Sequence, residues 1–142
     1  MALRHKGREF ALQMLFQWEV GRQETARIED GFWRMTRAET RTREFANQLF
    51  EGVAKESEGL DELIGRHAQN WRIERIALID RAILRLAAFE LRSTKTPPRV
   101  VLDEAVELAK TFSSEDAAGF INGVLDAILK TLRQKKADAT TE

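Results

Sequence analysis

A cluster of cationic side chains near the amino terminus is the stretch whose residue types point most directly to chemistry. It consists of Arg4, His5, Lys6 and Arg8. Cations normally favour the carboxyl-terminal end of a helix, where the helix dipole is negative. Here they stand at the start of a predicted helix, where they could hold the phosphates of RNA or DNA while His5 stacks or donates a hydrogen bond. An ordinary solvated terminus explains the same residues, so both interpretations remain open at this point.

A carboxylate on an apolar helix face is the second candidate. Glu90 falls on the same helical stripe as Ile83. Because burying an unpaired carboxylate is costly, we expect a cation close to Glu90, and catalysis is the less favoured alternative. Asp80, Arg81 and Arg85 are predicted on the outer face of that helix, where they are available to solvent or to a partner.

Motifs for catalysis, metal binding and cofactor binding are missing from the sequence. It contains no phosphate-cradling glycine loop and no arrangement of a nucleophile with a base. The two histidines, His5 and His67, cannot assemble a histidine-rich metal site, and His67 is interpreted as a packed or half-exposed side chain. The absence of cysteine excludes disulfides and thiolate chemistry. We therefore predict no enzyme, no cofactor and no metal site, and favour a binding or adaptor module.

Length and charge limit the possible functions further. The 142 residues suit one domain, predicted to span residues 1–136, with a flexible polar tail over residues 137–142. The formal net charge is zero, so binding of nucleic acid must be local or shared with a partner. No apolar run approaches the ~20 residues of a membrane span and no secretory signal is visible, so a cytoplasmic protein is expected.

The apolar periodicity predicts an all-α fold with seven helical segments and no strand. The segments cover residues 4–21, 25–37, 40–56, 60–67, 77–92, 98–112 and a last stretch with an apolar seam from Phe120 to Leu132. Gly59 is expected to separate the third segment from the fourth, and Trp71 to lead into the fifth. The first three segments are expected to form a three-helix unit.

The segment Thr96–Lys130 offers the longest packing surface, in two helices that meet at a polar turn. Pro98 suits the first turn of the first helix, because the N–H it lacks has no partner there. A serine in the turn is expected to cap the second helix, with Asp116, three residues after Ser113, reaching back as in a capping box. Gly123 lies inside the second helix, where glycine costs about 1 kcal/mol relative to alanine. We expect a neighbouring helix backbone to approach Gly123 closely, with a hinge or a ligand contact as alternatives.

Three motifs in this order resemble the NusB family of bacterial transcription antitermination factors. The longest is PPRVVLDEAVELAKTFSSEDAAGFINGVLDAIL, at residues 97–129. The motif DRAILRL with FEL, within residues 80–91, resembles the family's preceding helix, and residues 8–19 resemble its first helix. The resemblance covers nearly the whole chain and is weakest over residues 22–42 and at the tail. It implies an all-helical fold of two small three-helix-like bundles.

The same resemblance implies a function and assigns residues to it. The family binds the boxA element of nascent ribosomal RNA transcripts together with the small-subunit ribosomal protein NusE. That complex joins the elongating RNA polymerase through other Nus factors and suppresses premature termination. The family's arginine-rich amino terminus corresponds to the basic cluster described above. Its acidic position associated with RNA affinity corresponds to Asp116, and its acidic position at the NusE interface corresponds to Asp80.

Two other functions are compatible with the same fold. NusB-like domains also occur as RNA-binding segments of ribosomal RNA cytosine methyltransferases, but 142 residues leave no room for a methyl-donor-binding domain, so a standalone factor is expected. A homo-oligomeric structural or adaptor protein without RNA binding of its own is the alternative, and a homodimer would hide the RNA face. The basic cluster is thinner than in some relatives, which favours RNA binding that depends on a partner.

Overall fold

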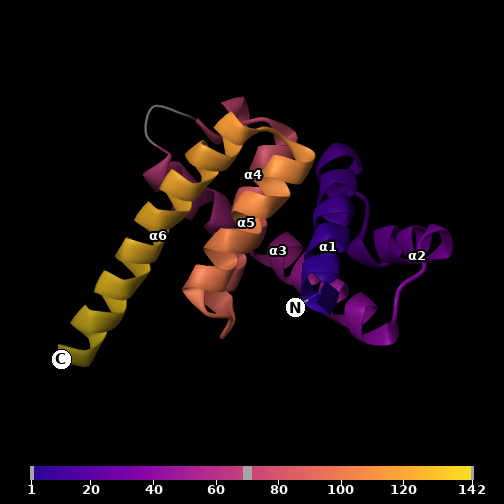
Figure 1. Ribbon diagram of the computed structural model, residues 1–142, viewed down its shortest axis with the longest axis horizontal. Coiled ribbons are helices and arrows are strands. Elements are labelled where there is room, and N and C mark those ends of the chain that lie inside the picture. The colour runs from indigo at the N-terminus through magenta and orange to yellow at the C-terminus, as the bar shows by residue number, and fades with distance from the viewer. Residues whose placement is uncertain (1, 69–71, 142) are drawn as a thin grey trace.

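The computed structural model describes residues 2–68 and 72–141, which form helices joined by short connections (Figure 1). The prediction of an all-α fold is confirmed, with six α-helices in the described part of the chain in place of seven. The helices are α1 (Ala2–Gly21), α2 (Thr25–Met35), α3 (Thr40–His67), α4 (Leu78–Ser93), α5 (Pro98–Phe112) and α6 (Glu115–Thr141), with a short 3₁₀ turn at Ile73–Arg75. None of these helices is long and apolar enough to cross a membrane.

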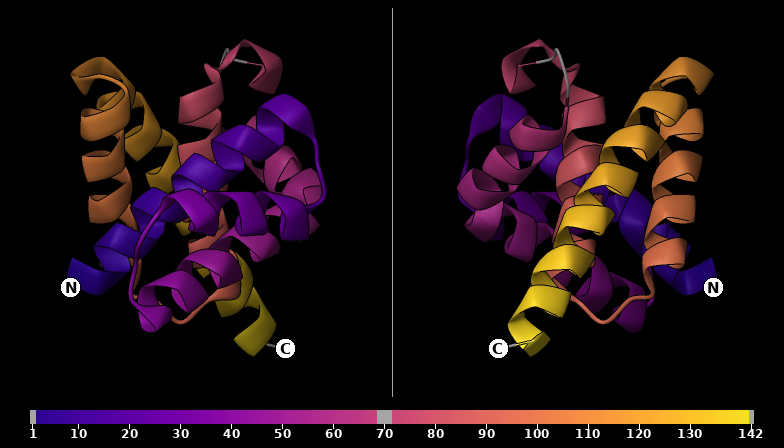
Figure 2. Two further views of the ribbon diagram at one scale, coloured as in Figure 1. Left: turned by 90° about the vertical axis from the view of Figure 1, so that its right-hand side faces the viewer. Right: turned by 90° about the vertical axis from the view of Figure 1, so that its left-hand side faces the viewer.

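The helices form two small bundles that share one core. Helices α1, α2 and α3 pack on one another, as do α4, α5 and α6, and α4 also contacts α1 and α3 (Figures 1 and 2). Every residue of α4 from Ala82 to Glu90 is buried. The central helix is therefore α4, which joins the two bundles.

Helix α3 continues where two separate helices were predicted. Gly59 lies inside it and does not break it. The apolar face that includes Val53 runs on through Leu60 and Ile64, and burying these side chains outweighs the ~1 kcal/mol cost of a helical glycine. A Cβ atom added at Gly59 would lie 3.4 Å from the Arg92 guanidinium nitrogens, which is ordinary van der Waals contact, so packing does not require a glycine there. The predicted lead-in at Trp71 lies outside the described residues.

The corner between α5 and α6 differs in detail from the prediction. Helix α5 begins at Pro98 as predicted. The cap of α6 is Ser114, whose Oγ accepts a hydrogen bond from the Ala117 N–H at 3.0 Å. The residue three positions after this cap is Ala117, so Asp116 cannot complete a capping box. Helix α6 then continues to Thr141, through most of the stretch predicted as a flexible tail.

The expected close packing at Gly123 is wrong. Gly123 is exposed, and a Cβ atom added there would meet nothing within 4 Å. Close approach occurs instead at two other glycines. A Cβ atom at Gly52 would lie 2.2 Å from the Phe89 ring, and one at Gly7 would lie 2.6 Å from the Phe45 ring. Nothing in the structure explains the glycine at position 123.

Candidate nucleic-acid interface

The predicted site residues fall on two ends of the molecule. The start of α1 and the α4–α5 connection lie at one end, and the α5–α6 corner and the start of α4 lie at the other (Figures 1 and 2). The basic cluster therefore belongs to the first end, and Asp80 and Asp116 belong to the second.

Arg4 and Lys6 are the exposed cations of the predicted cluster. The Arg4 guanidinium lies 5.4 Å from the centroid of the Phe45 ring. The Lys6 ammonium lies 5.2 Å from the centroid of the Phe10 ring and 3.6 Å from Glu9 Oε1. Both side chains can reach a phosphate from the surface, because neither is enclosed by other helices.

His5 is half-buried and ties α1 to α5. Its Nδ1 lies 2.6 Å from Glu104 Oε2, and its Nε2 lies 3.9 Å from Glu9 Oε1. This contact orients the imidazole toward the protein. Stacking of His5 on a base remains a prediction, and it would compete with the contact to Glu104.

Arg8 does not lie on the surface as predicted. The residue is 2 % exposed, and its Nε and Nη2 each donate a 2.8 Å hydrogen bond to a Glu90 oxygen. Burial alone would lower the pKa of Arg8, but the hydrogen bonds and charge of Glu90, together with the charge of Glu104, raise it above its ordinary value. The prediction of a cation beside Glu90 is confirmed. The Arg8 guanidinium is already paired with Glu90 inside the protein, so a phosphate contact by Arg8 stays a prediction that would require this pair to open.

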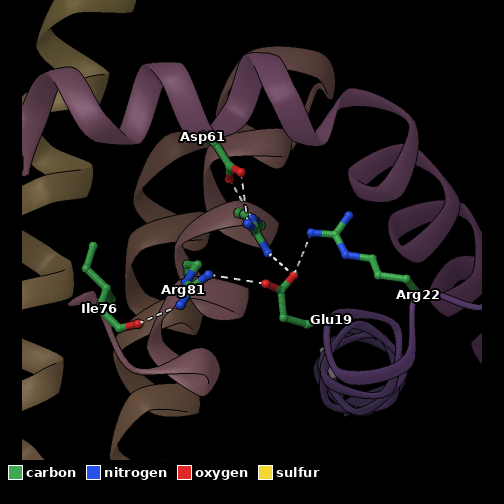
Figure 3. A network of polar contacts seen from close by, with 6 residues as sticks. Glu19, Arg22, Asp61, Ile76 and Arg81 are labelled. Atoms are coloured by element: carbon green, nitrogen blue, oxygen red, sulfur yellow. Dashed lines mark hydrogen bonds and ion pairs between the residues drawn. The ribbon is translucent and has the colours of Figure 1, made fainter. Parts of the chain in front are cut away.

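Arg81 and Arg85 also lie inward, contrary to the prediction of an outer face. Glu19 of α1 accepts hydrogen bonds from Arg85 at 2.6 Å and from Arg81 at 3.2 Å, and Asp61 of α3 holds Arg85 in a bidentate pair at 2.6 and 2.8 Å. Figure 3 shows Glu19 between Arg81 and Arg22, on the side of α4 that faces α1. Burial alone would lower the pKa of Arg85, but Asp61 and then Glu19 raise it. These contacts join the two bundles and leave Arg81 and Arg85 little reach toward a partner.

Asp80 and Asp116 line one cavity of about 340 Å³ at the second end. Its wall also contains Arg75, Ser114 and Phe120. Asp80 is half-buried, and its Oδ1 is enclosed without a hydrogen-bond partner among the described residues. Asp116 is exposed beside the start of α6. The structure thus brings together two residues that the resemblance assigns to different partners.

Beside Arg4, the first end carries residues that the sequence did not single out. Arg4 and Phe45 line two neighbouring hollows of about 550 and 420 Å³. Arg41 completes the first hollow, and Lys95 lies in the wall of the second. The spacing of Arg41 and Phe45, four residues apart on one helix, could have suggested a shared face. Nothing in the sequence indicates that Lys95 lies beside them.

Comparisons with known proteins agree on one family. The NusB family model matches residues 5–130. The transcription antitermination protein NusB of Sorangium cellulosum is 45 % identical, over 97 % of this chain and 99 % of that protein. The protein of the same name from Koribacter versatilis is 46 % identical, over 94 % and 95 %.

Solved structures of NusB proteins have the same fold as this chain. T. maritima NusB matches with a TM-score of 0.80 and 32 % identity, over 89 % of this chain and 90 % of that chain. A crystal structure of the antitermination factors NusB and NusE in complex with double-stranded RNA matches with a TM-score of 0.83 and 28 % identity, over 92 % and 98 %.

Proposed function

The chain belongs to the NusB family of transcription antitermination proteins, and we propose that it binds the boxA element of nascent ribosomal RNA transcripts together with the ribosomal protein NusE. Because this family consists of antitermination factors, the prediction that the chain is not an enzyme is confirmed. The observation that carries the proposal is the similarity to a NusB solved together with NusE and double-stranded RNA. On this proposal the complex joins RNA polymerase through other Nus factors, in the cytoplasm where transcripts are made.

The exposed cations at the start of α1 support an RNA contact that needs a partner. Arg4 and Lys6 are exposed, His5 is half-buried, and Arg8 is enclosed. Two exposed cations on a chain of zero net charge release few counterions, so this cluster alone supplies little affinity. A second protein that contributes its own RNA contacts would supply the remaining affinity.

The cavity at the second end supports roles for Asp80 and Asp116. The half-buried Asp80 lines this cavity, where a hydrogen-bond donor from NusE would approach its carboxylate. Asp116 is exposed and negatively charged, so it would repel a nearby phosphate and limit the affinity for RNA. These roles follow the assignments that the resemblance implied.

One titration tests the proposed function. A boxA-containing RNA is titrated with the full chain, with and without NusE, while the oligomeric state is recorded by light scattering. We expect weak binding by the chain alone and tighter binding with NusE. Failure to bind in both conditions, with a stable homodimer in solution, would favour the alternative of a homo-oligomeric adaptor.

A further inference from the structure

We propose that a single-stranded part of the bound RNA continues across the Phe45 groove, formed by Arg4, Arg41, Phe45 and Lys95. This site is separate from the residues that the family resemblance assigns, apart from Arg4, which the two share. The proposal rests on the proposed function, because it adds a path for RNA that the first contact has already captured.

The groove consists of two hollows that meet at one pair of side chains. Arg4 and Phe45 line both the 550 Å³ hollow, which Arg41 completes, and the 420 Å³ hollow, whose wall includes Lys95 and Gln48. Sites for small molecules usually measure about 300–1,000 Å³, so each hollow can admit a nucleotide. Three separate segments build it: the start of α1, the first turns of α3 and the α4–α5 connection, all at one end of the molecule (Figures 1 and 2).

The cations of the groove carry charge that the protein does not neutralise. Arg4, Arg41 and Lys95 are exposed, and none of them forms an ion pair with a described residue. Other cations of this chain do pair with carboxylates, as Arg8 does with Glu90. Three unneutralised cations along one groove attract a polyanion, and phosphates are the groups they would hold.

Phe45 supplies a flat surface between these cations. One side of its ring packs against α1. The ring lies so close to Gly7 that a Cβ atom there would clash with it, and the buried Arg8 guanidinium lies 5.3 Å from the ring centroid. The Arg4 guanidinium covers it at 5.4 Å. Bases of single-stranded RNA stack on aromatic rings and on guanidinium planes, so this pair can receive a base on either component. An acidic peptide would match the cations but would make no use of the aromatic ring, which favours RNA.

The charged wall is tested by two exposed substitutions and a matched control. Arg41→Ala and Lys95→Ala are compared with Lys55→Ala, an exposed cation of α3 that lines neither hollow. The probe is a boxA-containing RNA with a ten-uridine single-stranded extension, titrated in the presence of NusE at several salt concentrations. We expect each groove variant to bind about 3- to 10-fold more weakly and to reduce the salt slope by about 0.7, while Lys55→Ala changes neither. Unchanged affinity and slope in both groove variants would overturn the proposal.

The aromatic surface is tested by Phe45→Leu and by crosslinking. Phe45→Leu is expected to weaken binding about tenfold without changing the salt slope, because stacking carries no charge. With 4-thiouridine in the extension, we expect crosslinks in peptides that contain residues 41–48 or 94–97 of the unmodified chain, which keeps the test informative if Phe45→Leu folds poorly. Crosslinks confined to other peptides would refute the groove.

Three further outcomes distinguish the groove from the proposed function and from general anion binding. If the unmodified chain binds no RNA even with NusE, both the proposed function and the groove are rejected. If the unmodified chain binds RNA and every groove variant binds equally well, only the groove is rejected. In the third outcome, a polyglutamate peptide displaces the uridine extension equally well from the unmodified chain and from Phe45→Leu. The groove would then bind anions in general, and the assignment to RNA would be rejected.

Discussion

Two arginines of this chain, Arg8 and Arg85, are held inside the protein by carboxylates from other helices. Their guanidinium groups match the carboxylates in two-point contacts, Arg8 with Glu90 and Arg85 with Asp61. A planar guanidinium suits this geometry better than an ammonium does. Arginine content near a helix start therefore does not measure how much positive charge reaches the surface.

Arg8→Ala is expected to change stability rather than RNA binding by the folded protein. Removing the guanidinium leaves Glu90 buried without its partner, which costs about 3–5 kcal/mol of the free energy of unfolding. Lys6→Ala is the matched control, because Lys6 is exposed and should alter stability by less than about 0.5 kcal/mol. Chemical denaturation measures both values, and titration of the folded variants with RNA measures the salt slope. A lower salt slope for Arg8→Ala at unchanged stability would return Arg8 to the phosphate contacts.

Glu29 should make the stability of the protein depend on pH. Burial, and then the hydrogen bond and charge of Glu51 and the charge of Asp30, raise the pKa of Glu29 from 4.5 to about 8. The folded state therefore holds a proton that the unfolded state releases above pH ~4.5, so the free energy of unfolding falls as pH rises from about 4.5 to 8. In Glu29→Gln this contribution disappears, and the decline measured by denaturation at several pH values should be shallower. An equal decline in both proteins would contradict the assignment to Glu29.

At the scale of the elements, the apolar periodicity was sufficient to predict where most helices lie. Pro98 and the polar turn near Ser114 marked the start of α5 and the corner before α6, because both act through local backbone chemistry. The effect of a glycine is harder to predict from the sequence, since it depends on what packs against that position. Gly59 was predicted to end a helix and Gly123 to lie under a neighbouring helix, and neither does. The glycine under a neighbouring ring is Gly52, and the sequence offered no sign of its contact with Phe89.

Gly52→Ala and Gly65→Ala should have opposite effects on stability although both lie in α3. A Cβ atom at Gly52 would approach atoms of the largely buried Phe89 ring to 2.2 and 2.6 Å, so α3 and α4 must separate locally. Such overpacking costs about 1–3 kcal/mol, and alanine's better helix propensity offsets only part of it. Gly65 faces open space, so Gly65→Ala should stabilise by about 0.5–1 kcal/mol. Denaturant unfolding of the two variants tests the difference, and stabilisation by both would mean that Phe89 moves aside without cost.

At the scale of the whole molecule, only part of the candidate site could be predicted from the sequence. The basic cluster was visible because its members are neighbours in the chain. The Phe45 groove was not, since it unites α1, the start of α3 and the loop that holds Lys95, which lies about ninety residues after Arg4. The joint position of Asp80 and Asp116 in one cavity likewise depends on how α4 and α6 pack. Long-range packing decides both placements, and no local spacing encodes it.

The connection between the two bundles should depend strongly on one carboxylate, Glu19. Glu19 of α1 accepts hydrogen bonds from Arg81 and Arg85 of α4, so it links one bundle to the other. Glu19→Gln removes the negative charge and leaves buried guanidinium groups only partly compensated, which should lower the free energy of unfolding by about 3–5 kcal/mol. Hydrogen exchange should also accelerate together in the last turns of α1 and the first turns of α4.

The matched control is Glu62→Gln, because among the described residues Glu62 pairs with Arg66 alone and both side chains are more than half exposed. An exposed pair of this kind contributes about 0–1 kcal/mol, so the control should change stability little and leave exchange in α1 and α4 unaltered. If the two substitutions proved equally mild, apolar packing of α4 against α1 and α3 would hold the bundles together without the ion pairs. If Glu19→Gln alone accelerates exchange at both helices, the buried carboxylate keeps the RNA-binding end and the Asp80 end of the molecule in a fixed relation.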